Sequence, residues 1–85
     1  MDLPPPSFQT LVATLASQAM HSLGLLAEEG KEPPKPNLEH AQFVIDLLGV
    51  LEEKTKSNLN DMERTLLQGA LTDLRMAYVE KKEQG

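Results

Sequence analysis

The sequence predicts an all-α fold of three helices without strands, and two observations lead to this prediction. Apolar residues recur at spacings of three and four in three segments, which is the pattern of amphipathic helices. Breaker residues separate these segments, and no alternating apolar and polar run is long enough for a strand. We therefore expect helices over about residues 7–25, 38–56 and 60–82. The length of 85 residues fits one domain, residues 1–85.

The first helix follows a proline-rich lead-in, residues 1–6, and has Ser7 as its expected N-cap. A serine there can accept a hydrogen bond from a backbone N–H group that the first turn leaves unpaired. Gly24 is the expected point of termination, because glycine is common at helix ends. No helix should cross the linker at residues 27–36, which contains three prolines, a glycine and several glutamates.

The second and third helices have clear start signals and a short connection. Asn37 is the expected N-cap of the second helix, which should end before Ser57 and Asn58. Asn60 followed by Glu63 resembles a capping box, in which each side chain binds the other residue's backbone N–H. A connection of a few residues predicts that these helices form an antiparallel hairpin. The longer first linker leaves open whether the first helix packs on its own hairpin or is swapped to a neighbouring chain.

The first two helices carry more apolar surface than a small bundle needs. Apolar side chains fill roughly 220° of the second helix, whereas a helix facing one core needs a stripe of somewhat over 100°. The first helix has no charged residue between Ser7 and Ala27. Soluble monomers rarely expose apolar patches of this size, so we expect an interface here. Its candidate residues are Phe8, Leu11, Leu15, Ala16, Ala19, Phe43, Leu47, Val50 and Leu51.

A second copy of the chain is the favoured partner for this surface. Most soluble oligomers are symmetric homo-oligomers, and two-fold dimers are the commonest kind. An unidentified protein is the alternative partner. A simpler interpretation also stays open, because a chain this short needs many of its hydrophobic residues, 40% of the total, for its own core.

Composition and charge argue against several classes of partner. The net charge is −5, and the eight basic residues are scattered among thirteen acidic ones, whereas nucleic-acid binding needs clustered Lys and Arg. The uncharged run is long enough to span a membrane, but its Gln, His, Ser and Thr side chains are costly in lipid. We expect a cytoplasmic protein. The absence of cysteine excludes disulfides and thiolate metal sites.

No group of residues predicts catalysis, a cofactor or a metal site. Ser17 and His21 share a helix face, but no acidic residue lies within one turn of His21 to orient the imidazole. Glu39, Asp46 and Glu53 form an acidic stripe along the second helix. Adjacent members are about 10 Å apart, which is too far to bind one ion. A solvated face explains this stripe.

Several motifs, taken in chain order, are similar to those of a known family. Residues 5–8, 23–25, 37–39 and 45–48 contribute, and the most specific motifs are Glu-Lys-Thr-Lys-Ser-Asn-Leu at 53–59 and Asp-Leu-Arg-Met-Ala-Tyr-Val at 73–79. Together they resemble a bacterial family of short helical proteins, the domain-of-unknown-function family 1844, over nearly the whole chain. The resemblance implies a bacterial, cytoplasmic protein and implies no activity.

The same resemblance suggests where a polar site common to the family would lie. Its positions are Lys54, Lys56, Asn58, Asp73, Arg75 and Tyr78. Asp73 also falls at the edge of the apolar arc of the third helix, beside Met62 and Leu66, where a carboxylate needs a partner from another helix or subunit. Gly49 and Gly69 depart from the family pattern, because they stand where a helix former is expected.

These observations predict a non-catalytic, oligomerising protein-interaction module of uncharacterised process. The alternative from another class is a helical bundle that binds a small molecule or lipid in an apolar pocket between helices. A weaker alternative is an enzyme assembled across subunits, with Asp73, Arg75 and Tyr78 facing a cleft.

Overall fold

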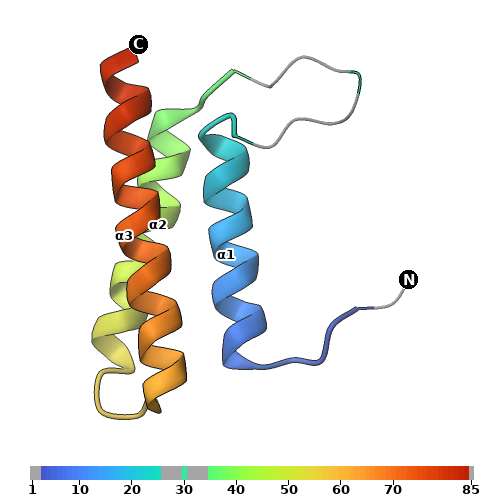
Figure 1. Cartoon of the computed structure of the whole chain (residues 1–85), viewed down its shortest axis with the longest axis vertical. Helices are drawn as coiled ribbons and strands as arrows, with labels where there is room; N and C mark the ends of the chain where they lie inside the picture. The colour runs from blue at the N-terminus through green and yellow to red at the C-terminus, as the bar shows by residue number, and fades with distance from the viewer. Residues whose placement is uncertain (1–2, 26–29, 31–34, 85) are drawn as a thin grey trace.

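Three α-helices make up most of residues 3–25, 30 and 35–84, which are the residues that the computed structural model describes. Helix α1 spans Phe8–Ser22, α2 spans Leu38–Lys54 and α3 spans Asp61–Gln84 (Figure 1). No strand occurs among these described residues. The prediction of an all-α fold with three helices is confirmed. Helices α1 and α3 point in one direction and α2 in the other, as expected for a hairpin of α2 and α3.

The N-caps of the first two helices lie where the sequence predicts them. The Ser7 hydroxyl oxygen accepts a hydrogen bond of 3.0 Å from the backbone N–H of Thr10. The side-chain oxygen of Asn37 accepts one of 3.1 Å from the backbone N–H of His40. Each bond satisfies one of the donors that the first helical turn leaves unpaired, so both helices begin within a residue of their expected start.

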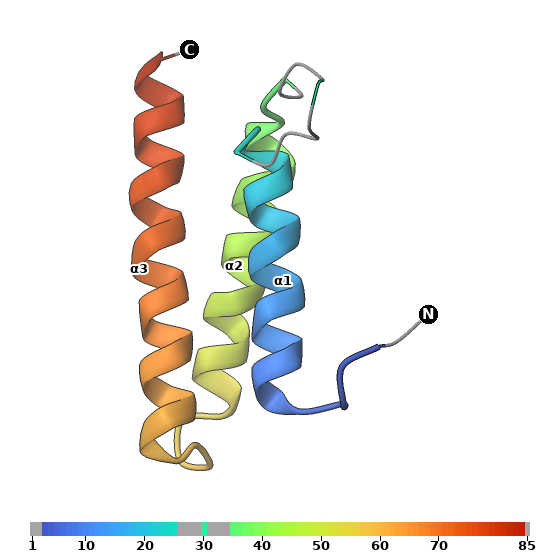
Figure 2. The same cartoon turned by 45° about the vertical axis from the view of Figure 1, so that its right-hand side comes forward.

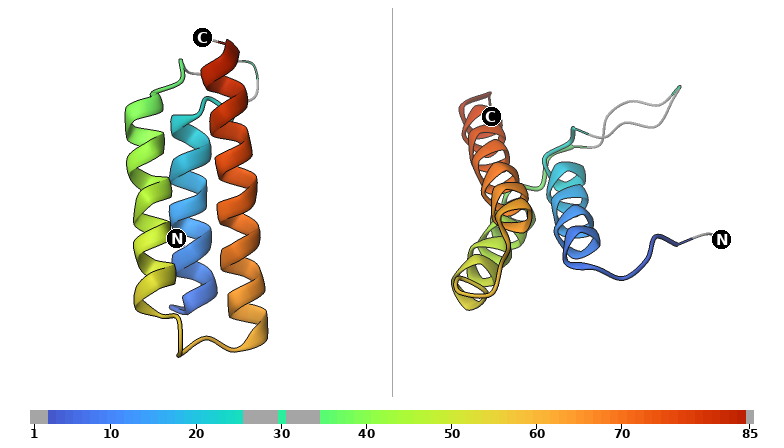
Figure 3. Two further views of the ribbon diagram at one scale, coloured as in Figure 1. Left: turned by 90° about the vertical axis from the view of Figure 1, so that its left-hand side faces the viewer. Right: turned by 60° about the horizontal axis from the view of Figure 1, so that its bottom comes forward.

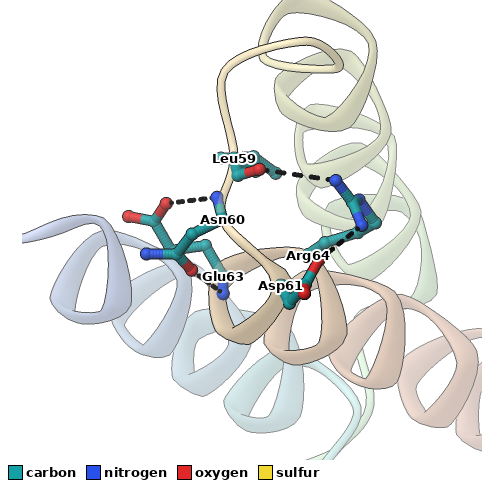
Figure 4. Close-up of polar contacts among 5 residues, drawn as sticks. All are labelled: Leu59, Asn60, Asp61, Glu63 and Arg64. Carbon is teal, nitrogen blue, oxygen red and sulfur yellow. Dashed lines mark hydrogen bonds and ion pairs between the residues drawn. The ribbon is translucent and has the colours of Figure 1, made fainter.

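Helix α3 begins with the predicted capping box (Figure 4). The side chain of Asn60 accepts a bond of 2.8 Å from the Glu63 N–H, and the Glu63 carboxylate accepts one of 3.0 Å from the Asn60 N–H. Arg64 adds a 3.0 Å ion pair to Asp61 and a bond to the backbone carbonyl of Leu59. These contacts determine where the connection ends and α3 begins.

Helix α1 ends earlier than the prediction of residue 25. Gly24 has a φ of 77°, a left-handed conformation that glycine adopts without steric cost. Its N–H donates to the carbonyl of His21, and the Leu25 N–H donates to the carbonyl of Met20, both at 3.0 Å. This pair of bonds is a Schellman motif, and it terminates the helix at Ser22.

The other predicted ends also need small corrections. Helix α2 ends at Lys54 rather than residue 56, because the next residue, Thr55, is the C-cap and its hydroxyl donates to the carbonyl of Leu51 at 2.7 Å. Helix α3 continues to Gln84 rather than 82, since no glycine or proline follows its two lysines within the helix. Most of the predicted linker at 27–36 lies outside the described residues.

The core lies where the three helices meet, and each of its side chains is at most 3% exposed. Its residues are Val12, Ala19 and Leu23 from the α1 segment, Ala41, Val44, Ile45 and Leu48 from α2, and Leu67, Leu71 and Leu74 from α3. The first helix therefore packs on its own hairpin, a point that the sequence left open. The helices lie side by side along their lengths (Figures 2 and 3).

Candidate functional site: an exposed face of helices α1 and α2

One side of α2 exposes a stripe of large apolar side chains. Phe43, Leu47 and Val50 are 58%, 38% and 55% exposed, and their spacing of four and three places them on one side of the helix. The other flank of α2 faces α3, because Gln42 lines a small hollow with Arg75 of α3. The stripe therefore points away from α3.

Helix α1 exposes the apolar side chain of Leu11 on the flank opposite to the one that faces α3. Gln9 and Ala13 line an open groove together with Met62 and Leu66, so this flank of α1 faces α3. Leu11 lies two residues from both Gln9 and Ala13, which is a rotation of about 200° around the helix. It is 46% exposed and lies on the same side of α1 as Gln18, seven residues later, which lines a hollow with His40 of α2.

A shared hollow joins the two flanks into one surface. His40 at the start of α2 lines a hollow with Gln18 and His21 of α1. The His40 ring also packs against the Phe43 ring, with centroids 6.3 Å apart. We call this surface the α1/α2 face, and its members are Leu11, Gln18, His21, His40, Phe43, Leu47 and Val50.

The structure sorts the nine predicted interface residues into three groups. Four are exposed on the α1/α2 face, namely Leu11, Phe43, Leu47 and Val50. Four others are partly buried against the core, namely Phe8, Leu15, Ala16 and Leu51. Ala19 is fully buried, which corrects its assignment to an interface, because α1 turns this residue toward its own hairpin.

The nine predicted interface residues did not include Gln18, His21 or His40, because all nine are apolar. A usable signal was present in the spacing of the polar residues. Residues at alternating intervals of three and four lie along one side of a helix whatever their polarity. His40 precedes Phe43 by three residues and therefore extends the stripe of α2. A search of the sequence for helical stripes of any residue type would have found these positions.

The six predicted polar-site residues do not form one site. Lys56 lines a hollow of about 430 Å³ at the α2–α3 turn, together with Glu53 and Arg64. Arg75 and Tyr78 line a separate hollow of about 270 Å³ between α2 and α3. Arg64 and Arg75 are eleven residues apart on α3, or about 17 Å along its axis. These two hollows are therefore distinct.

The remaining polar candidates, Lys54, Asn58 and Asp73, are exposed. Within the described part of the chain, Asp73 takes part in no hydrogen bond or ion pair. A partner from another helix was expected because a carboxylate beside apolar residues is costly to bury, but water can solvate Asp73 at this position. A partner from another subunit stays a prediction.

Ser17 and His21 both line the polar hollow between α1 and α2. It measures about 580 Å³ and is also lined by Lys35, Asn37 and His40, and no carboxylate is among its described lining residues. No group of three or more His, Asp or Glu side chains in residues 3–25, 30 and 35–84 could hold a metal ion. None of the helices that the structure describes has the length and apolar character to traverse a membrane.

A family model matches most of the sequence. The family is described as a domain of unknown function, DUF1844, and the match covers residues 5–80. The chain belongs to this family. The matched region contains α1, α2 and most of α3, so the whole α1/α2 face lies within the DUF1844 domain. No curated protein and no solved structure matches the chain.

Proposed function

We propose that this DUF1844 domain is a non-catalytic protein-interaction module that associates with itself through the α1/α2 face. The exposed aromatic ring of Phe43 is the observation that carries the proposal. A phenylalanine side chain gains about 1.5–3 kcal/mol when it is removed from water, and here it is 58% exposed. A partner that covers Phe43, Leu47 and Val50 would recover much of this free energy.

The exposed apolar surface is large compared with the core of the chain. Four large side chains of the α1/α2 face are at least 38% exposed, namely Leu11, Phe43, Leu47 and Val50. Among the described residues, the core contains ten side chains at or below 3% exposure. A domain of this size buries a modest fraction of its surface and gains stability when association extends its core.

A non-catalytic role is supported by the composition of the hollows. Among the described residues that line the hollow with Ser17 and His21, none is a carboxylate that could orient the imidazole, and a nucleophile needs such a third group as well as its base. Asp73 lines neither of the hollows that contain Arg75 or Lys56. The residues with useful chemistry are therefore distributed over separate surfaces.

Light scattering coupled to gel filtration tests the proposal. We expect the unmodified chain to elute with twice its monomer mass and to dissociate on dilution. Phe43→Glu should shift the mass to that of a monomer without loss of helicity in circular dichroism. Met76→Glu on α3 is a matched control, since Met76 is 59% exposed and lies outside the α1/α2 face. A chain that is monomeric at all concentrations would contradict the proposal, as would equal effects of both substitutions.

A second candidate function is binding of a small apolar molecule or lipid between α1 and α3. The groove lined by Ala13, Met62 and Leu66 has a volume of about 640 Å³, within the range of ligand sites, although it is open to solvent. An apolar fluorescent dye titrated into the Phe43→Glu variant tests this function without dimerisation. Saturable binding that Met62→Lys abolishes would support it.

A further inference from the structure

The polar hollow between α1 and α2 brings together both histidines of the chain. His21 of α1 and His40 of α2 line this hollow of about 580 Å³, and the chain has no other histidine. Lys35, two residues before the N-cap of α2, adds a third side chain that can carry positive charge. The hollow lies at the end of the bundle where α1 ends and α2 begins (Figure 1).

The charge in this hollow is opposite to that of the chain as a whole. The chain has thirteen acidic and eight basic residues and a net charge of −5. Among the described lining residues none is acidic, and none comes from α3. Glu39 is adjacent to His40 in α2, but it is exposed and does not line the hollow. A site that gathers cationic side chains on an acidic protein suits an anion.

The other described residues of the hollow can donate hydrogen bonds to such an anion. Ser17 and Ser22 offer hydroxyl groups, and Gln18 and Asn37 offer amide groups. The side-chain oxygen of Asn37 already accepts the N–H of His40. The part of the Asn37 amide that stays available is therefore its NH₂ group, which is a donor.

The C-terminus of α1 does not require these donors. Basic and polar side chains near a helix end often bind its last carbonyl groups. Here the carbonyls of residues 19–22 each accept a hydrogen bond from a backbone N–H group. One of these bonds, of 2.6 Å, runs from the Asn37 N–H to the Ser22 carbonyl and joins the two walls of the hollow. The side-chain donors are thus held in place and are free for a ligand.

Ser22 is an independent indication of a ligand. It is 7% exposed, the one buried polar residue in the part of the chain that the structure describes, and it lines the hollow. No hydrogen bond joins its hydroxyl to another described residue. Buried polar groups in folded proteins are normally hydrogen-bonded. An acceptor oxygen of a bound anion would give the Ser22 hydroxyl its partner.

We infer that this hollow binds a phosphate group, either as inorganic phosphate or as the phosphate ester of a small molecule. A phosphate group presents several strong acceptor oxygens in different directions, which suits donors from α1, from α2 and from the segment before α2. The N-terminus of α2 adds the positive end of its dipole. A carboxylate pairs best with the planar fork of an arginine, and no arginine is among the described lining residues. The inference does not rest on self-association, because one chain supplies all of these groups.

An NMR titration of the unmodified chain tests the site. Inorganic phosphate and glycerol 3-phosphate are added separately, with chloride at equal ionic strength as the reference. We expect saturable shifts of both imidazole signals and of the backbone amides around Ser22 and Asn37. Tighter binding of the ester would identify a phosphorylated small molecule as the ligand, and equal binding would identify the phosphate group alone. Shifts that do not saturate, or that chloride reproduces, would overturn the inference.

Two charge-removing variants locate the binding. Lys35→Gln and His40→Gln should each raise the Kd for phosphate about fivefold to tenfold, because each removes a charged donor. Lys54→Gln is the matched control, since Lys54 is exposed at the other end of α2 and its removal changes the net charge as Lys35→Gln does. Its Kd should equal that of the unmodified chain. Equal weakening in Lys35→Gln and Lys54→Gln would show general charge screening and would overturn the site.

The pH dependence gives a second readout. Histidine gains its positive charge as the pH falls from about 8 to about 5. Sulfate is the probe here, because its own charge stays constant over this range. Its affinity should therefore be higher at pH 6 than at pH 8 in the unmodified chain, and this difference should shrink in His40→Gln. An affinity for sulfate that is the same at both pH values would contradict a role of the two imidazoles.

Discussion

The side chain of Arg75 reaches from α3 to α2, where its Nη2 atom lies 3.7 Å from the position that a Cβ atom would take on Gly49. This distance is an ordinary van der Waals contact, so the arginine does not need the glycine to make room for it. The helical spacing predicted that Arg75 lies on the solvated side of α3. In the structure it is exposed but lies across the α2–α3 boundary, beside the hollow that Tyr78 lines.

Replacing either helical glycine by alanine should stabilise the protein. Gly49→Ala meets only the flexible end of Arg75, and a Cβ at Gly69 has nothing within 4 Å. Glycine in a helix interior costs about 0.5–1 kcal/mol relative to alanine, and we expect an increase of that size for each substitution. Urea unfolding followed by circular dichroism, at one fixed protein concentration, measures the change. A loss of stability in Gly49→Ala alone would show that the Arg75 contact cannot adjust.

Removing the cap of α3 should destabilise the domain. In Asn60→Ala the Glu63 N–H loses its 2.8 Å acceptor, and we expect a cost of about 1 kcal/mol in the free energy of unfolding. Gln68→Ala, on the exposed surface of the same helix, is the control and should have little effect. Chemical denaturation compares the two. An Asn60→Ala variant as stable as Gln68→Ala would mean that water replaces the cap without cost.

Truncation of a core leucine should cost far more than truncation of an exposed one on the same helix. Leu71 is 1% exposed and Leu66 is 39% exposed. Leu71→Ala should lower the free energy of unfolding by about 2–5 kcal/mol, a large part of the stability of a small domain. Leu66→Ala should cost clearly less. Thermal and urea unfolding give both values, and similar losses would show that the groove beside Leu66 is closed in solution.

The sequence by itself determined the number of helices, their starts and the capping of α3. These features depend on residues within one turn of each other, such as the reciprocal bonds of Asn60 and Glu63, so their interactions form whatever the rest of the chain does. The C-terminal ends were less accurate. The motif around Gly24 uses two residues beyond the last helical one, which spacing alone does not reveal.

Only the tertiary structure decided which side of each helix is covered. A helical period shows that residues share a side, but it does not show which side a neighbouring helix occupies. Ala19 and Leu11 were therefore equal candidates for an interface, until the packing of α1 on its own hairpin buried the first and exposed the second. The division of the polar candidates between two hollows has the same cause. Distances between helices depend on packing, which residue spacing along one helix does not contain.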